Sequence, residues 1–170
     1  MNEIFHVDMS GRIYEGRTIG IAIVGAKNKI NYGCAIKGNL LKLIKKRLFK
    51  KDIFEDSAKL YAICIFLLVR EIKEEVQTLI ICNDEDFNIV EKVLDYLLDE
   101  YSFEIINITE FRKRLGRNVG SLADNCANIY RKKALKPTRW TKGKKLNIIT
   151  INFKIIKKYW DELKENKVSD

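Results

Sequence analysis

The sequence has few of the residues that usually build nitrogen and sulfur metal sites. It contains one histidine, His6, and no CxxC pair, because its cysteines lie far apart at Cys34, Cys64, Cys82 and Cys126. A structural zinc site usually needs four such ligands at characteristic spacings. Each cysteine stands among apolar or small residues, so we expect free, buried thiols in a reducing compartment, without zinc or disulfides.

Other absences narrow the class of protein further. A single proline, Pro137, and a hydrophobic fraction of 46% favour a folded body with little disordered linker. The longest apolar run, residues 60–69, is shorter than the roughly 20 residues that span a bilayer. The amino terminus MNEIFHVD lacks a basic stretch followed by an apolar one, so we expect a cytoplasmic protein. No GK[ST] phosphate loop occurs, which disfavours nucleotide-driven chemistry.

Charge is abundant and mainly positive. The chain has 170 residues, a net charge of +9 and a pI of about 9.3. This length suits one domain with a short extension, and we place the division at residues 1–136 and 137–170. A positive surface attracts phosphates, so nucleic acid is the favoured partner.

Hydrophobic periodicity predicts a three-stranded antiparallel meander over residues 4–9, 18–25 and 31–37. A basic amphipathic helix follows at 40–50, and Asp52-Ile53-Phe54-Glu55 resembles the capping box at the start of a largely buried helix reaching about residue 73. The second half predicts strands at 78–82, 103–108 and 146–151, helices at 88–101, 121–134 and 154–166, and a loop at 110–120. The fold class is therefore α/β.

Four aspartates stand at the ends of these elements. Asp8 ends the first strand, Asp56 opens the buried helix, Asp84 follows a later strand and Asp124 opens a late helix. Hard divalent cations prefer oxygen ligands, and a cation site needs such carboxylates to converge. The order of the acids along the chain is thus compatible with a metal site where element ends meet.

At these positions the chain resembles the ribonuclease H-like superfamily. The words that carry the resemblance are Val7-Asp8-Met9-Ser10-Gly11, Ile80-Ile81-Cys82-Asn83-Asp84 and residues 116–128, GRNVGSLADNCAN. The resemblance covers roughly residues 4–134. It implies a mixed sheet with helices on both faces. The carboxyl-terminal strand and helix after Pro137 depart from the family pattern, and we expect them to form an extension packed on the same domain. The resemblance also implies that Asp8, Asp56, Asp84 and Asp124 bind two Mg²⁺ or Mn²⁺ ions that hydrolyse phosphodiester bonds.

Each acid also has a simpler interpretation. Asp8 could bond the turn that follows it, Asp84 could favour the next helix through its dipole, and Asp124 could belong to the Ser121 cap. Glu55 is the alternative to Asp56, because the two share the first turn of one helix. His6 lies on the same strand face as Asp8, where a structural histidine is the more common case than a proton carrier.

The longest basic segment is residues 131–145, which contains no acid. Two further basic segments lie at residues 42–51 and 112–117, the second just ahead of Asp124. Lysine and arginine neutralise phosphates, and an exposed tryptophan can stack on a base. The candidate nucleic-acid contacts are Arg117, Arg131, Lys132, Lys136, Arg139, Trp140, Lys142, Lys144 and Lys145. The alternative is that these side chains are solvated and that Trp140 packs against the body.

The resulting hypothesis is a metal-dependent nuclease acting on RNA/DNA hybrid or structured nucleic acid. The alternative is an inactive ribonuclease H-like module that binds nucleic acid or a partner protein. The apolar stripe of residues 154–166 could dock a protein partner or a second copy of the chain, although such stripes more often belong to the core.

Overall fold

The computed structural model describes residues 3–135 and 146–168, and the following concerns these residues. The strands are β1 (Glu3–Ser10), β2 (Ile19–Gly25), β3 (Asn31–Ile36), β4 (Val76–Ile81), β5 (Glu104–Asn107) and β6 (Asn147–Ile148). The helices are η1 (Ile13–Glu15, a 3-10 turn), α1 (Gly38–Leu48), α2 (Ile53–Val69), α3 (Phe87–Leu97), α4 (Ile108–Leu115), α5 (Asp124–Leu135) and α6 (Phe153–Glu165).

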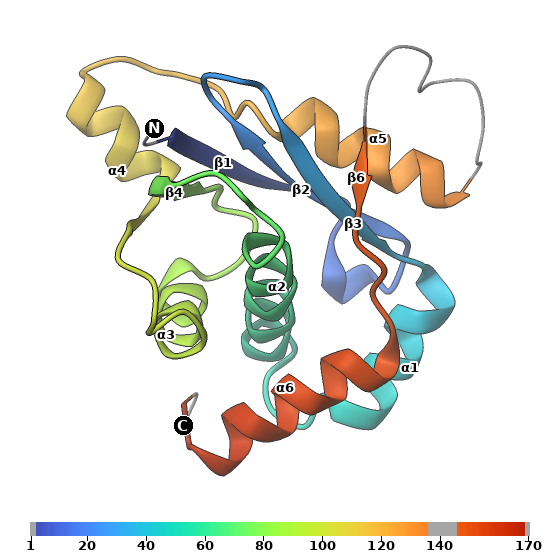
Figure 1. Ribbon diagram of the computed structural model, residues 1–170. Helices are drawn as coiled ribbons and strands as arrows, with labels where there is room; N and C mark the ends of the chain where they lie inside the picture. The colour runs from blue at the N-terminus through green and yellow to red at the C-terminus, as the bar shows by residue number, and fades with distance from the viewer. Residues whose placement is uncertain (1–2, 136–145, 169–170) are drawn as a thin grey trace.

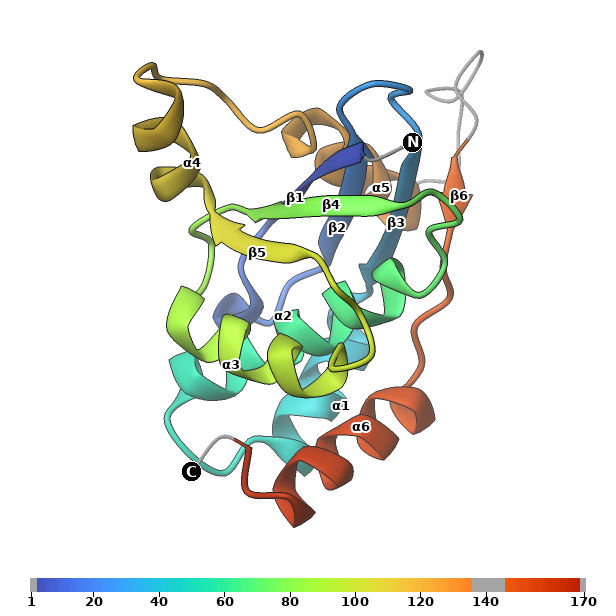
Figure 2. The same cartoon turned by 60° about the vertical axis from the view of Figure 1, so that its left-hand side comes forward.

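The strands form one mixed sheet in the order β5-β4-β1-β2-β3-β6. β2 is antiparallel to β1 and β3, whereas β4 runs parallel to both β1 and β5. Figure 1 shows α2 and α3 beneath the sheet and α5 across its opposite face, and the turned view in Figure 2 adds α4 to the α5 side. Helices therefore cover both faces of the sheet, and the predicted α/β class is confirmed.

The meander and the buried helix follow from the sequence pattern. The three predicted amino-terminal strands match β1, β2 and β3, and the predicted basic helix matches α1. Asp52 caps α2, because its carboxylate accepts hydrogen bonds from the backbone amides of Phe54 and Glu55 at 2.8 and 3.3 Å. Residues 56–69 of α2 are buried, so most faces of this helix contact protein. It ends at Val69, earlier than predicted.

Small residues let α5 approach the opposite face of the sheet. Ala22 of β2 is buried against Ala127 of α5 and against Ala123, the residue before this helix. A Cβ atom at Gly20 would overlap the backbone of Ala127 and Arg131, and one at Gly33 would overlap the ring of Tyr130. The close crossing of α5 over β2 and β3 therefore depends on glycines in the strands.

Two further predicted segments differ from the structure, besides α3, which ends at Leu97 and not at residue 101. The loop predicted at 110–120 is wrong in its first half, which belongs to α4: Asn107 caps this helix by accepting from the amide of Glu110 at 2.8 Å, and Phe111 packs against a cluster containing Ile80 and Ile106. The strand predicted at 146–151 shortens to β6, because only Asn147 and Ile148 pair with β3. In each case a tertiary contact decided the conformation.

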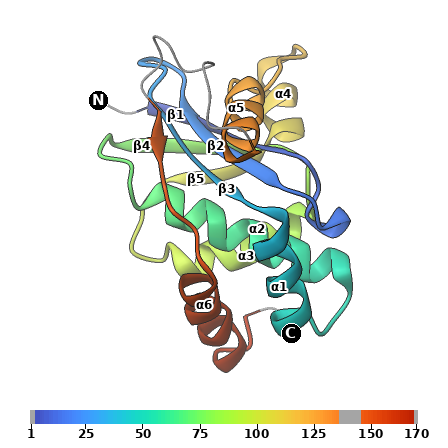
Figure 3. The ribbon, with the colours of Figure 1, turned by 90° about the vertical axis from the view of Figure 1, so that its right-hand side faces the viewer.

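The apolar face of α6 packs inside the chain. Ile156, Tyr159, Trp160 and Leu163 are buried. Trp160 stacks on Phe49 with ring centroids 5.5 Å apart, and the Tyr159 hydroxyl pairs with Arg70 at 2.7 Å. Figure 3 shows α6 beside α1, below the sheet. The stripe is therefore core, as the intramolecular alternative predicted. A homodimer stays a prediction, as does the domain division at residue 136.

The helices of the described segments are too short or too polar to cross a lipid bilayer.

We predict that Gly20→Ala destabilises the protein by about 1–3 kcal/mol, because the new methyl group forces α5 away from β2. Urea denaturation measures the free energy of unfolding. Gly120→Ala is the matched control, since a Cβ atom at Gly120 meets nothing within 4 Å. Equal losses in the two variants would contradict the close packing of α5.

Candidate functional site

The parallel pairing of β1 and β4 brings their carboxyl ends to the same edge of the sheet. Val7 pairs with Ile81, and the amide of Cys82 donates to the carbonyl of Val7 at 3.1 Å. Asp8 follows Val7 directly, and Asp84 lies two residues beyond Cys82. The carboxyl ends of parallel strands are a common place for ligand sites in α/β sheets.

A small pocket of about 260 Å³ opens at this edge. It receives residues from β1, the β4–α3 connection, α4 and the start of α5. Its lining residues are Asp8, Cys82, Asn83, Asp84, Ile108, Arg112, Ser121 and Asp124. Three of the four predicted acids thus line one pocket.

Asp8 is 7% exposed and is fixed on both oxygens. Its Oδ1 accepts from the amide of Met9 at 2.9 Å, and its Oδ2 accepts from the thiol of Cys82 at 3.3 Å. Burial raises the pKa of Cys82 to about 12, so the thiol remains protonated and can donate. These contacts hold the carboxylate in one orientation.

Asp84 lies close enough to Asp8 for their charges to interact strongly. Burial, followed by the negative charge of Asp8, raises the pKa of Asp84 to about 7. Its Oδ2 is buried and has no hydrogen-bond partner in the structure. The pKa of the adjacent Glu85 is also raised to about 7 by burial, against the charge of Arg12. Two neighbouring carboxyls with raised pKa values therefore lie at this edge of the sheet.

Asp56 and Glu55 are not among the residues that line this pocket. Asp56 is 4% exposed, and its Oδ2 accepts from the backbone amides of Lys50 and Lys51 at 2.8 and 3.0 Å. Glu55 forms an ion pair with Lys51 at 3.7 Å. The contacts of Asp56 fix the turn between α1 and α2, which is a structural role.

Asp124 is exposed at the first position of α5. The hydroxyl of Ser121, in the turn before the helix, accepts from the amide of Ala123 at 3.2 Å. This bond lies within the turn, and α5 begins only at Asp124, so Asp124 is the first residue of the helix and not the third as expected; its place in the lining of the pocket is beside this turn.

His6 has the surroundings of a packed residue. It is 5% exposed, and its ring meets that of Phe111 edge to face with centroids 5.7 Å apart. Burial lowers the pKa of His6, although the charge of Asp8 opposes this. A neutral ring in an aromatic contact agrees with the structural interpretation.

Arg112 was missed as an individual site residue. It lines the pocket from α4, and its Nε donates to the carbonyl of Val119 at 2.8 Å. The sequence placed it in a basic run before Asp124, but that stretch was predicted as a loop. The neighbouring Arg114 instead pairs with Glu104 and Glu110 away from the pocket. Of these two arginines of α4, Arg112 is therefore the one that lies beside the carboxylates.

The candidate nucleic-acid contacts are only partly described. The Nε of Arg131 donates to the carbonyl of Thr18 at 2.9 Å, while Arg117 and Lys132 are exposed. The remaining candidates lie outside the described residues, namely Lys136, Arg139, Trp140, Lys142, Lys144 and Lys145. Their proposed role stays a prediction.

The carboxylates suit a hard cation that also binds water and substrate better than one that is coordinated by protein ligands alone. Within residues 3–135 and 146–168, no three histidine, cysteine or acidic side chains are arranged to hold a metal ion. Magnesium, however, commonly takes one or two carboxylates and completes its octahedron with water and phosphate oxygens. Asp8 and the unpartnered oxygen of Asp84 provide that number of ligands. The residues therefore fit a divalent cation.

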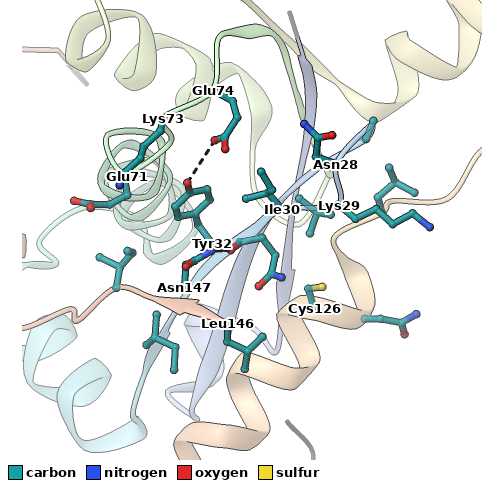
Figure 4. A pocket seen from close by; sticks show the side chains of 17 residues that line it. Asn28, Lys29, Ile30, Tyr32, Glu71, Lys73, Glu74, Cys126, Leu146 and Asn147 are labelled. Carbon is teal, nitrogen blue, oxygen red and sulfur yellow. Dashed lines mark hydrogen bonds between the residues drawn. The ribbon is translucent and has the colours of Figure 1, made fainter. Parts of the chain in front are cut away.

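A larger cavity of about 1120 Å³ lies elsewhere, around the β2–β3 turn and the segment entering β4. Figure 4 shows Tyr32 pointing toward Glu74, whose carboxylate accepts from the tyrosine hydroxyl at 3.4 Å. This cavity includes none of the predicted acids. We therefore place the candidate chemistry in the smaller pocket, where carboxylates converge.

Comparisons with known proteins identify no family. No protein-family model matches the chain, and no curated protein is similar to it. Two solved structures are similar at 15% identity: NurA, with a TM-score of 0.24, and NurA with manganese, with a TM-score of 0.21. They cover 98% and 99% of this chain, which spans 48% and 49% of theirs, about half their length. Likeness at these TM-scores supports no inference about fold or function.

We predict that Asp84→Asn stabilises the metal-free protein at pH 8. A carboxyl whose pKa is raised by folding favours the folded state when protonated, so this stability is lost as pH rises from about 4 to about 7. Allowing for solvent screening, the gain should be about 2 kcal/mol, or roughly 4–8 °C in Tm, and should vanish near pH 4. Thermal melts in EDTA measure it. Asp99→Asn, an exposed acid, is the control; no gain over it would contradict the account.

We predict that Asp56→Ala destabilises the metal-free protein by about 1–3 kcal/mol, because the backbone amides of Lys50 and Lys51 lose the charged acceptor that they share. Urea denaturation in EDTA measures this loss, and Glu55→Ala serves as the control. A carboxylate that acts only as a metal ligand would give the opposite result, since its removal relieves repulsion when no cation is bound.

Proposed function

We propose that the chain is a divalent-metal-dependent nuclease with a ribonuclease H-like fold, formed by residues 1–136 and extended by residues 137–170. The observation that carries the proposal is the convergence of Asp8, Asp84 and Asp124 on one pocket. The acids come from β1, the β4–α3 connection and α5, which are distant in sequence. A pocket for chemistry on a phosphodiester accounts for this placement better than capping alone, since capping does not require convergence.

The topology supports the fold proposal. The antiparallel meander β1–β3 continues through β4 and β5 as parallel strands, connected by α2 and α3 on one face. This is the mixed arrangement that the resemblance implied, with β1 at the centre and its carboxyl end at the site. The short β6 and α6 then extend the sheet edge and the helical layer.

The charges in the pocket suit a phosphodiester substrate. A bound Mg²⁺ or Mn²⁺ ion would activate water and neutralise charge on the departing oxygen. Asp8 and Asp84 would hold such an ion, and the two hydrogen bonds to Asp8 would keep its carboxylate oriented. Arg112 lies where it can bind a phosphate oxygen of the substrate. Asp124 lines the rim, where it can orient water or take part in binding a second ion.

We predict that the protein cleaves labelled hybrid, duplex, single-stranded or junction substrates in Mg²⁺ or Mn²⁺. Asp8→Asn and Asp84→Asn should each lower the cleavage rate at least about 100-fold, because each removes a charged ligand. Gel assays with EDTA and Asp99→Asn as controls measure this. Cleavage that survives in Asp8→Asn and in EDTA would show a contaminating or unrelated activity and refute the proposal.

A second candidate is an inactive module of the same fold that binds nucleic acid or a partner protein. It is favoured by Asp56, whose carboxylate is already engaged by two backbone amides, and by the lack of a three-ligand arrangement in the described segments. Binding of nucleic acid without cleavage in either metal would support this candidate. Cleavage dependent on Asp8 would exclude it.

A further inference from the structure

An exposed pair of aromatic rings connects the turn after β1 with the start of α2. Tyr14 of η1 is 36% exposed and Phe54 of α2 is 57% exposed. Their ring centroids are 5.6 Å apart with an interplanar angle of 60°. Neither ring is needed to fill the core. Exposing two large rings to water is unfavourable, so such a pair at the surface can indicate a binding site.

Three cations lie beside this pair, together with one exposed acid, Glu15, which follows Tyr14. The guanidinium of Arg12 lies over the Tyr14 ring, 5.9 Å from its centroid. The ammonium of Lys45, from α1, donates to the carbonyl of Tyr14 at 2.6 Å, and Lys42 lies against Gly16. The acids of α2 beside the pair are already engaged: Asp52 caps the helix, and Glu55 pairs with Lys51.

The surface adjoins the carboxylate pocket through Arg12. The positive charge of Arg12 acts on Glu85, the residue next to Asp84. Arg12 is also four residues beyond Asp8, on the turn where β1 ends. Arg12 is thus the cation that connects the end of β1 with the ring pair.

We propose that Arg12, Tyr14 and Phe54 form an aromatic platform on which an unpaired base of single-stranded nucleic acid stacks. Aromatic faces accept any base, and neighbouring cations follow the backbone, which is how sequence-tolerant binding of single strands works. The inference rests on the proposed function for its place beside the site, because it names the form of substrate presented to the carboxylates.

A second ring pair lies among different charges, although its Phe103 is partly buried against the core. Tyr101 and Phe103 have nearly the same geometry, with centroids 5.7 Å apart, and Tyr101 is 44% exposed. Exposed acids precede that pair at Asp99 and Glu100. The cations beside the first pair outnumber its acid Glu15, whereas two acids precede the second pair, so the second pair serves as the comparison.

The test measures binding alone. Fluorescence anisotropy with fluorescein-labelled 12-nucleotide oligothymidylate and oligouridylate, in EDTA, compares the full chain with Tyr14→Leu/Phe54→Leu. The double variant should bind roughly tenfold more weakly, while Tyr101→Leu/Phe103→Leu should bind like the unchanged protein. Affinity falls as salt concentration rises, and Arg12→Gln should make the slope of log affinity against log salt concentration shallower by about 0.7.

Several outcomes would overturn the platform. They are an unchanged protein that binds no oligonucleotide, equal affinities for the two double variants, and an equal loss on a closed circular duplex, which has neither unpaired bases nor an exposed terminal base pair. Thermal melts identify any variant that fails to fold, and the single variant Phe54→Leu then repeats the comparison. Because no metal or cleavage is involved, failure of the nuclease proposal is recognised separately by the Asp8→Asn cleavage assay.

Discussion

The parallel pairing of β1 with β4 is the constraint on which the candidate site depends. It places Val7 opposite Ile81, so that Asp8 and the loop containing Asp84 leave the sheet at one edge. Along β1, Phe5, Val7 and Met9 enter the core beneath the sheet, which puts Asp8 on the opposite face. A shift of one residue would exchange these faces and bury the carboxylate among apolar side chains. The hydrophobic pattern of β1 therefore fixes the chemistry as well as the packing.

The site stores unfavourable electrostatic energy that the rest of the fold tolerates. Asp8 is held by an amide and a thiol, while Asp84 keeps one buried oxygen without a partner. Stability alone would favour a neutral side chain at Asp84. A carboxyl whose charged form is disfavoured by its surroundings is typical of functional positions. The extensive core formed by α2, α3 and the sheet provides the stability that offsets it.

The sequence predicted the elements with strong periodicity and missed those decided by contact. The alternating strands of the meander and the apolar α2 with its Asp52 cap were predicted correctly, because local pattern and tertiary structure agree there. α4 was missed, since its eight residues carry only one buried side chain, Ile108, and depend on the Asn107 cap. The order of the acids indicated a common edge, but the engagement of Asp56 by Lys50 and Lys51 arises from a turn that periodicity does not specify.

The central claim is that Asp8 and Asp84 together bind a divalent cation. Isothermal titration of the protein with Mn²⁺ at pH 7, in buffers of different ionisation enthalpy, tests it directly. The account predicts saturable binding with release of a proton, because the raised pKa of Asp84 leaves that carboxyl partly protonated until the cation arrives. Binding should be lost in Asp8→Asn and retained in Asp99→Asn. Absence of binding, or equal binding by Asp8→Asn, would contradict the account.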